Sequence, residues 1–476
     1  MGRGRLIRIG SAALLVLAVA AASAWLGLEG PAPRDDVMRW LTLLGGSTSA
    51  LVAAGLLVSS LPRREAVIAI LAGAVVLRAG ALAAPVSLSD DIERYVWDGA
   101  VLANGMDPYA HYPEDLVGAG PGLDEARLER LNSPRYYTIY PPLAQAAFGA
   151  AALTEPTLDG ALALRVIFAA FDVLAVWALL GLLARLRRAP GWALLYAWCP
   201  LVYWEVAAGG HTEALMTPLL LLGVNAALDG EAPKAAVFVA LAASAKLTAL
   251  VAGPLIVIYL AHRVGLGRAL ASLALGAAAF ALGFAPFASE TLIPHLRESA
   301  MLFSGRFSFN APVYYALRDS MGYVEGLRPD VDWMVMPALA AATLLWLALM
   351  AFVQDGSRRR FVAGLAFSFL GLLLLARVAH PWYLLPALAL GVAARSPTLA
   401  LASVLLPLSY LRYEPFDREE PMVLALQFVP ILITLLVEGA VRLLARSPAT
   451  TRVDAPDAEA SRPRGASCSV SATEGA

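Results

Sequence analysis

The chain has 476 residues, of which 59% are hydrophobic and only 15% are charged, and its formal net charge is −1. Soluble domains carry about 25% charged residues, so this composition excludes an ordinary soluble protein, and the balanced charge gives no indication of nucleic-acid binding. Cys199 and Cys468 lie in an apolar stretch and a polar tail. We do not expect them to pair, so disulfides indicate no compartment.

Long apolar stretches recur along the chain, and about 20 apolar residues in a helix cross the hydrocarbon core of a bilayer. Stretches of this length are 7–27, 38–60, 66–86, 161–184, 190–208, 212–229, 268–286, 333–353, 361–378 and 422–445, and shorter ones are 382–395 and 398–411. The stretch 234–261 is too long for one simple span, and we interpret it as two short helices divided near Lys246. The sequence therefore predicts an all-α, polytopic membrane helix bundle with about 12–14 transmembrane helices.

The first apolar stretch could be either a signal peptide or a membrane anchor. Basic residues precede it, and Ala22-Ser23-Ala24 resembles a cleavage site. Because the apolar run continues past this site, we expect an uncleaved anchor.

Basic residues in the short connections predict the orientation, since cytoplasmic connections of membrane proteins are enriched in Lys and Arg. The arginines that flank the apolar stretches are Arg3, Arg5, Arg8, Arg63, Arg64, Arg185, Arg187, Arg188, Arg263, Arg268, Arg358, Arg359, Arg360, Arg442 and Arg446. If these are cytoplasmic, both termini are cytoplasmic and the long loops 87–160 and 287–332 are extracytoplasmic. This count requires that 138–153 lies along the outer interface, or dips in and returns. The polar tail 447–476 is predicted to be a disordered cytoplasmic segment.

The first large outer loop begins with a charged run from Ser89 to Gly99, SDDIERYVWDG. Carboxylates at a membrane face are costly unless they are solvated, paired or used. In an interfacial helix the polar side chains share one face; these are Asp91, Arg94, Tyr95 and Asp98. Capping of this helix by Asp90 with Glu93 is the simpler alternative, but a cap needs one acid and two are adjacent here.

Two further segments place ionisable groups on the same predicted side. Gly209 and Gly210 allow a tight turn before His211 and Glu213, although a plain polar turn in a helical hairpin is the alternative. Lys246 lies in apolar surroundings. An ammonium group there needs an anionic partner such as phosphate, unless its side chain reaches the surface.

Arg377 and His380 occur at another outer boundary, next to Trp382 and Tyr383. The aromatic residues can be ordinary interface anchors, whereas Arg and His can hold a lipid-linked phosphate.

Two other sets are weaker candidates. Arg306, Phe309 and Asn310 in the second large loop can stack on or bond to a sugar, as side chains of any exposed loop can. Arg165 and Asp172 are seven residues apart in one span and thus share a face. We expect them to pair with each other or with Arg78, in a structural role.

The first outer loop also contains the segments 104–109 (NGMDPY) and 138–143 (TIYPPL). Together with the run 89–99, they resemble the GT-C superfamily of membrane glycosyltransferases, and are similar to bacterial polyprenol-phosphate-mannose-type transferases. The resemblance extends from about residue 66 to residue 445. It divides the chain into additional membrane helices (1–65) and a catalytic domain (66–446).

The resemblance implies a glycosyltransferase of the cell envelope. It would move a hexose from a polyprenyl-phosphate donor to a glycan or lipid acceptor on the outer face of the inner (plasma) membrane. The resemblance implies that the hexose is mannose and that the configuration of its anomeric carbon is inverted. Asp90 or Asp91 would be the general base. Candidates for the donor phosphate are Lys246, Arg377 and His380, and candidates for sugar or acceptor binding are Arg94, Tyr95, Asp98, Tyr140, His211, Glu213, Arg306, Asn310 and Tyr383.

We expect no cofactor, no metal ion and no nucleic-acid partner. Asp90, Asp91 and Glu213 nevertheless offer oxygen ligands that suit a divalent ion. The sequence does not indicate whether the protein is a monomer or an oligomer.

A transporter or flippase for a lipid-linked or small polar substrate is the main alternative. Many such folds consist of repeated halves with a binding site at mid-membrane. We detect no internal repeat in the chain, and its polar segments fall on one predicted side, which favours an enzyme. A structural or assembly protein is a third interpretation, and it would not require the confined acid pair.

Overall fold

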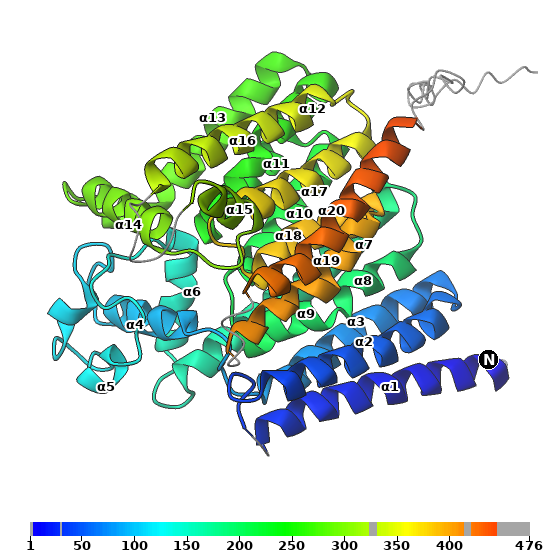
Figure 1. Ribbon diagram of the computed structural model, residues 1–476, viewed down its shortest axis with the longest axis horizontal. Helices are drawn as coiled ribbons and strands as arrows, with labels where there is room; N and C mark the ends of the chain where they lie inside the picture. Colours follow the sequence, from blue (N-terminus) through cyan, green and yellow to red (C-terminus); the bar gives the residue numbers. More distant parts are fainter. Residues whose placement is uncertain (1–2, 29–30, 323–330, 414–419, 445–476) are drawn as a thin grey trace, which may run out of the picture.

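The structure is a computed structural model that describes residues 3–28, 31–322, 331–413 and 420–444 (Figure 1). Within these ranges the regular elements are helices, and one isolated parallel bridge joins Phe309 to Val378. Eight helices of the described part are long and apolar enough to cross a membrane. The prediction of an all-α polytopic bundle is confirmed, and the protein is a multi-pass membrane protein.

Long helices form the body of the molecule. They are α1 (Arg3–Leu28), α2 (Val37–Ser59), α3 (Arg63–Leu82), α7 (Gly160–Arg185), α10 (Glu213–Asp229), α13 (Leu266–Gly283), α16 (Asp332–Phe352), α17 (Arg358–Leu375) and α20 (Glu420–Leu444). Shorter pieces between them are α11 (Ala232–Ala245), η4 (Leu247–Ala252), α12 (Gly253–Val264), η6 (Pro381–Leu384), α18 (Leu385–Ala394), α19 (Pro397–Leu405) and η7 (Leu406–Tyr413).

The long helices run back and forth between two ends of the molecule (Figure 1). One end carries the short helices α4 (Asp91–Ala103), η1 (Pro113–Leu116), α5 (Glu125–Leu128), α6 (Pro142–Ala152), α14 (Leu292–Arg306) and α15 (Pro312–Ser320). We call it the loop end. The start of α1 and the end of α20 lie at the opposite end.

The opposite end, which we call the basic end, joins several arginine-rich connections. Arg358 Nη1 donates to the carbonyl oxygen of Arg185 (3.5 Å), and Arg442 Nη2 donates to that of Ala394 (3.0 Å). The connections after α7, α16 and α18 therefore meet there, together with the last turn of α20.

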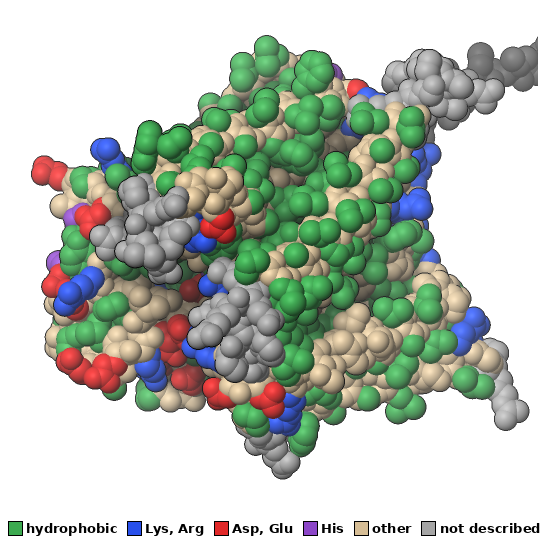
Figure 2. Space-filling model, in the orientation of Figure 1, with side chains coloured by type: hydrophobic (Ala, Val, Ile, Leu, Met, Phe, Trp, Pro, Cys, Tyr) green, Lys and Arg blue, Asp and Glu red, His purple; other side chains and the backbone are tan. Residues whose placement is uncertain are grey.

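Side-chain types divide along the same direction (Figure 2). Apolar side chains cover the flank of the long helices, acidic and basic ones gather at the loop end, and mainly basic ones occupy the opposite edge. On α16, Leu345 is 72% exposed and Phe352 is 86% exposed. An apolar belt between two polar ends is the surface that a bilayer requires.

The predicted span 190–208 is not one continuous helix. It consists of η2 (Pro190–Ala193), α8 (Leu194–Ala197), α9 (Pro200–Tyr203) and the π-helix η3 (Trp204–Ala208). Pro190 and Pro200 each begin a piece, because proline has no amide hydrogen to continue the preceding helix. The π turn carries Glu205 into the interior, where it is 2% exposed.

Two other expectations about the spans are confirmed. The stretch 234–261 is interrupted at Lys246, whose backbone is extended (φ −156°, ψ 126°) between α11 and η4. The segment 138–153 does not cross the bundle: its helix α6 has 11 residues and so measures about 17 Å, well short of a hydrocarbon core of about 30 Å.

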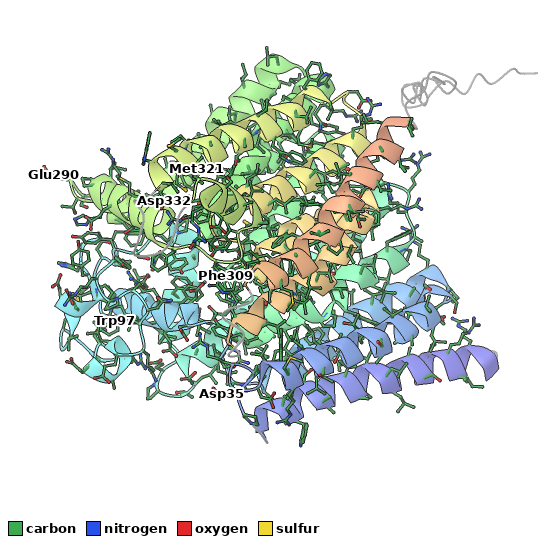
Figure 3. The ribbon with its side chains drawn as sticks, viewed as in Figure 1. Asp35, Trp97, Glu290, Phe309, Met321 and Asp332 are labelled. Carbon is green, nitrogen blue, oxygen red and sulfur yellow. The ribbon has the colours of Figure 1, made fainter. Side chains whose placement is uncertain are left out.

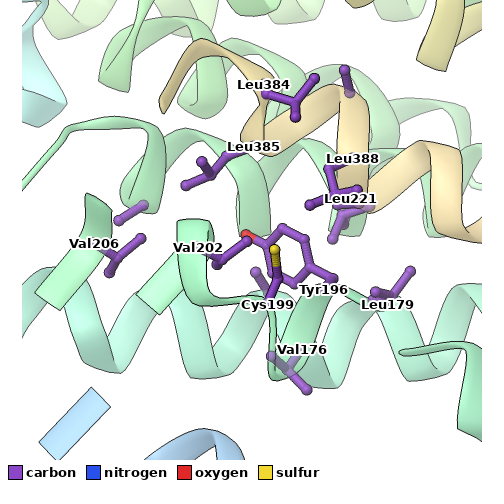
Figure 4. Packing of buried hydrophobic residues seen from close by; sticks show 14 of the residues in the cluster. Val176, Leu179, Tyr196, Cys199, Val202, Val206, Leu221, Leu384, Leu385 and Leu388 are labelled. Atoms are coloured by element: carbon purple, nitrogen blue, oxygen red, sulfur yellow. The ribbon is translucent and has the colours of Figure 1, made fainter. Parts of the chain in front are cut away.

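Apolar side chains of α7, α8, α9, α10 and α18 form the centre of the bundle (Figure 4). One buried ion pair crosses it, in which Arg78 Nε donates to Asp172 Oδ2 (2.7 Å) and Tyr196 donates to Asp172 Oδ1 (2.6 Å). The predicted pairing of Asp172 with Arg78 is confirmed. The alternative pairing with Arg165 is wrong, because Arg165 donates instead to the carbonyl oxygens of Ala81, Leu82, Ala84 and Ala207.

Candidate functional site

A cavity of about 340 Å3 opens where the loop end meets the long helices. Its walls come from the α1–α2 connection, the start of α4, the segment 132–140, the segment around Phe309 and the turns next to η6 and η7. Phe309 marks this position in Figure 3. The cavity thus collects segments that are far apart in the sequence. The predicted site residues that line it are Asp90, Asp91, Arg94, Tyr140 and His380.

Asp91 is the first residue of α4 and lines the cavity. Its backbone amide donates to Ser89 Oγ (3.3 Å), which fixes the turn into the helix. Burial raises the pKa of the Asp91 carboxyl, the positive charge of Lys246 acts in the opposite direction, and Asp90 raises it further. A carboxylate with a raised pKa is a stronger proton acceptor once it is ionised.

The adjacent Asp90 has a different environment. Arg34 donates from Nη1 to Asp90 Oδ1 (2.9 Å) and from Nη2 to Asp90 Oδ2 (3.2 Å). The Arg34 guanidinium also lies over the ring of Tyr413, 4.7 Å from its centroid, and the Tyr413 hydroxyl donates to the Leu88 carbonyl (2.8 Å). Both Asp90 oxygens are thus engaged by a cation, which separates the roles of the two aspartates.

His211 enters the site on the turn that the two glycines form. Gly210 has φ +72°, and a Cβ atom there would lie 2.7 Å from Ile92 Cδ1, so the turn packs closely against α4. His211 Nδ1 lies 4.0 Å from Asp91 Oδ2, and its Nε2 lies 3.3 Å from Glu205 Oε2. Tyr410 holds the same Glu205 by donating to Oε1 (2.8 Å).

The imidazole of His211 is 1% exposed, and neither of its ring nitrogens has a hydrogen-bond partner in the described part of the chain. Buried polar atoms usually have a partner, and exceptions call for an explanation such as a catalytic role. Asp91, which lines the cavity, therefore lies next to two buried ionisable groups, His211 and Glu205.

Four rings stack into a column along one wall. The ring centroids are 3.6 Å apart for His211 and Trp382, 4.0 Å for Trp382 and His380, and 4.5 Å for His380 and Phe309. Burial lowers the pKa of His380 to about 3, and the nearby cations Lys246 and Arg412 add to this effect. His380 is therefore a neutral imidazole, and its Nδ1 is buried without a hydrogen-bond partner among the described residues.

Lys246 lies beside this wall rather than in the lining of the cavity. Its ammonium group pairs with the Glu213 carboxylate and lies 4.5 Å from the centroid of the Tyr383 ring. The expected anionic partner of Lys246 is thus supplied by the protein. Its positive charge acts on the cavity through its effects on Asp91 and His380.

Arg94 and Tyr140 line the loop side of the cavity, and Asp98 supports Arg94 from behind. Arg94 Nε donates to Asp98 Oδ1 (2.8 Å), and its Nη1 donates to the carbonyl oxygens of Ser133 (3.1 Å) and Tyr136 (2.8 Å). Arg94 and Tyr140 line the cavity, whereas Asp98 is 1% exposed and lies behind them. Tyr95 is likewise buried, and its ring is stacked on that of Phe148.

Two predicted residues lie elsewhere. Arg377 Nη1 pairs with Asp332 Oδ2 (2.6 Å), and its guanidinium lies over the ring of Tyr314. Asn310 and Gln427 donate to each other's amide oxygens (3.1 Å each way), and Asn310 is 2% exposed. The structure does not bring either one to the cavity. The side chain of Arg306 lies outside the described residues.

Sequence reasoning missed Arg34, Tyr410 and Tyr413 as parts of this cavity, whereas Phe309, one of the weaker sugar-binding candidates, does line it. Arg34 alone had a signal, because it is a basic residue in the short connection between the first two spans, opposite the end where the basic short connections gather. The aromatic residues had none, since their types and spacing are ordinary for a membrane protein.

In the part of the chain that the structure describes, no group of three or more His, Cys, Asp or Glu residues could hold a metal ion. The expectation of a metal-independent site remains a prediction.

The sequence matches the family model of the alpha-(1->6)-mannopyranosyltransferases, N-terminal domain, over residues 7–262. This range is more than half of the 476 residues. The chain belongs to this mannopyranosyltransferase family. As a member of this family it is a glycosyltransferase, which transfers a sugar from a donor to an acceptor in a membrane setting. No curated protein matches the chain.

The family match covers only part of the candidate site. The matched range contains Asp91, His211 and Lys246, and it ends before His380. It begins at residue 7 and includes α1 and α2, which pack with α3 in one bundle. The division of the chain at residue 65 stays a prediction.

Proposed function

We propose that the protein transfers a mannosyl residue from a polyprenyl-phosphate donor to the 6-hydroxyl group of a mannose-containing glycan, with inversion. The family name supports the sugar and the linkage. The cavity at the loop end supports the position of the reaction, because it lies where the apolar flank meets the polar end. A lipid-linked donor needs such a boundary, since its tail remains in hydrocarbon while its sugar is in water.

Asp91 is the proposed general base. It takes the proton from the acceptor hydroxyl while that oxygen attacks the anomeric carbon. The bond from the anomeric carbon to the phosphate oxygen breaks, and polyprenyl phosphate leaves with both bonding electrons. A β-linked donor then gives an α-linked product.

The contrast between the two aspartates carries this assignment. Arg34 donates to both oxygens of Asp90, so this carboxylate is occupied by a cation instead of being open to an acceptor hydroxyl. Asp91 lines the cavity with a raised pKa and with His211 at 4.0 Å. We further propose that Glu205 and Tyr410 orient His211 toward Asp91.

The departing phosphate needs positive charge or hydrogen-bond donors. His380 offers a neutral imidazole with an unpartnered Nδ1 in the cavity wall. Lys246 supplies positive charge from behind the wall, although Glu213 offsets part of it. Arg377, which pairs with Asp332 away from the cavity, is no longer a candidate for this role.

The proposed orientation puts the loop end outside the cytoplasm. The arginines of the short connections gather at the opposite end, which is the cytoplasmic end under the positive-inside rule. The membrane would then be the inner membrane, with both the start of α1 and the end of α20 on the cytoplasmic side.

The test uses purified protein with polyprenyl-phosphate mannose and a mannoside acceptor. Loss of a general base costs about 10²- to 10⁴-fold in rate, so we expect Asp91→Asn to lose at least about 100-fold in kcat. Asp90→Asn is the matched control variant. We expect it to lose less than about tenfold in kcat, because Asp90 takes no part in the proposed proton transfer. An Asp91→Asn protein of unchanged activity would refute the base, and label crossing sealed vesicles without a new glycosidic bond would favour a transporter.

A further inference from the structure

A second and larger cavity lies on the flank of the bundle, along α2, and reaches the basic end. Its volume is about 1270 Å3, and it lies between α2, the start of α3, the segment 184–201 and the α19–η7 region. Pockets for small molecules usually measure about 300–1,000 Å3. The lining is mostly apolar, with Leu44, Trp192 and Leu405 among its residues. Its size and lining fit long hydrocarbon chains.

Three arginines also line this cavity, namely Arg63, Arg187 and Arg188. Among its described lining residues there is no acid. Nε and Nη1 of Arg188 are buried and have no hydrogen-bond partner in the described part of the chain. Buried guanidinium nitrogens of this kind normally bond to an anion or a carbonyl oxygen.

The three arginines belong to neighbouring connections. Arg63 begins α3 directly after α2, and a Cβ atom on Gly191 would lie 3.2 Å from Ser59 at the end of α2. The connection after α7, which carries Arg187 and Arg188, therefore lies close to the α2–α3 connection. The cavity combines an apolar cleft along the helices with a cationic rim at the basic end.

We propose that this cavity binds one anionic glycerophospholipid of the surrounding bilayer. Its phosphate contacts Arg63, Arg187 and Arg188, and its acyl chains lie in the apolar cleft. Basic pockets between transmembrane helices are the sites at which anionic head groups bind.

The lipid-linked donor does not fit this position. Helix α7 starts at the loop end and finishes at the basic end after 26 residues, which corresponds to about 39 Å. A donor phosphate held by Arg187 would therefore be separated from Asp91 by most of the thickness of the membrane. The lipid site is independent of the proposed reaction.

The test measures lipid retained by the detergent-purified full chain in native mass spectrometry. The two probes are phosphatidylglycerol and phosphatidylcholine with identical acyl chains, added in equal amounts. Each arginine near an anionic head group changes lipid binding by about fivefold. We expect one retained phosphatidylglycerol and a preference over phosphatidylcholine of more than about tenfold.

Charge variants test the rim. The triple variant Arg63→Gln, Arg187→Gln, Arg188→Gln should lose the preference and retain both lipids alike. The matched triple variant Arg64→Gln, Arg263→Gln, Arg268→Gln removes the same charge from exposed arginines that do not line the cavity. It should keep the preference of the unmodified chain.

Two glycine variants test the cleft without changing charge. Gly45 lines the cavity and Gly46 does not, and a Cβ atom on either would meet nothing within 4 Å. Gly45→Trp should therefore lower retention of both lipids several-fold, while Gly46→Trp should not. Equal retention of the two lipids by the unmodified chain, or identical behaviour of the two glycine variants, would overturn the proposal.

Discussion

Arg34 holds both carboxylate oxygens of Asp90 across 56 positions of the chain, whereas the adjacent Asp91 faces the cavity with His211 4.0 Å away. Two neighbouring acids of the same chemical type are thereby given unlike environments. One is paired with a cation from the α1–α2 connection, and the other is half-buried in the cavity wall with its pKa raised. Unlike environments of this kind are how a site assigns distinct roles to like groups.

The Arg34–Asp90 contact should appear as a non-additive effect of the two substitutions on transfer activity. Both side chains are partly exposed (35% and 43%), so the pair contributes only about 0.2–1 kcal/mol to stability. We expect Arg34→Gln to lower transfer about tenfold, because it releases Asp90 beside the base. The double variant with Asp90→Asn should be no worse than Arg34→Gln alone. Additive losses in this double-mutant cycle would show that Arg34 acts on the substrate rather than through Asp90.

The pH dependence of kcat/KM should report the environment of Asp91. Burial raises its pKa above the ordinary value of about 3.9, so the base becomes protonated, and activity is lost, at a higher pH than for an exposed aspartate. Lys246 opposes this rise. Lys246→Gln should therefore move the acidic limb of the profile to still higher pH, and Lys246→Arg should restore it. An acidic limb that stays in place in Lys246→Gln would contradict this electrostatic link.

The turn that carries His211 should not tolerate a side chain at Gly210. Its φ of +72° is unfavourable for other residues by about 1–2 kcal/mol, and a Cβ atom would lie 2.7 Å from Ile92 Cδ1. Gly210→Ala should lower the thermal unfolding temperature in detergent and reduce activity. Gly253→Ala is the control, since a Cβ atom there meets nothing within 4 Å. Adding Ile92→Val, which removes Cδ1, should recover part of the loss.

Two Arg–Asp ion pairs should differ sharply in their contribution to the free energy of unfolding. Asp172 is fully buried with Arg78 and Tyr196, so Asp172→Asn leaves an unpaired buried cation and should cost about 3–5 kcal/mol. Asp229 pairs with Arg185 in a partly exposed position, and Asp229→Asn should cost below about 1 kcal/mol. Unfolding in detergent distinguishes the two. Equal losses would mean that the buried pair is not a stabilising element.

Much of the helical framework could be predicted from hydropathy, because apolar length is what a bilayer demands. The interruption at Lys246 and the short α6 were also foreseeable, since a charge and a Pro-Pro pair are strong local signals. The span 190–208 was not. Its apolar composition concealed the breaks at Pro190 and Pro200 and the π turn that directs Glu205 inward.

Several ionisable residues of the candidate site could be predicted, but the sequence did not show which other candidates lie away from the cavity. Asp91, His211 and His380 could be found because polar groups at a membrane boundary need a reason. Arg377 and Asn310 had the same signal, yet Asp332 and Gln427 satisfy them. Such pairings join segments distant in the sequence, and no local pattern in one sequence reveals them.

The position of Arg34 has a practical consequence for anyone who shortens this protein for expression. A chain trimmed to start at residue 66 would keep the other walls of the cavity but lose the counter-ion of Asp90. The freed negative charge beside Asp91 would raise its pKa again, so such a fragment should need more alkaline medium to work. The two leading helices, which look dispensable in a hydropathy plot, help to set the working acidity of the site.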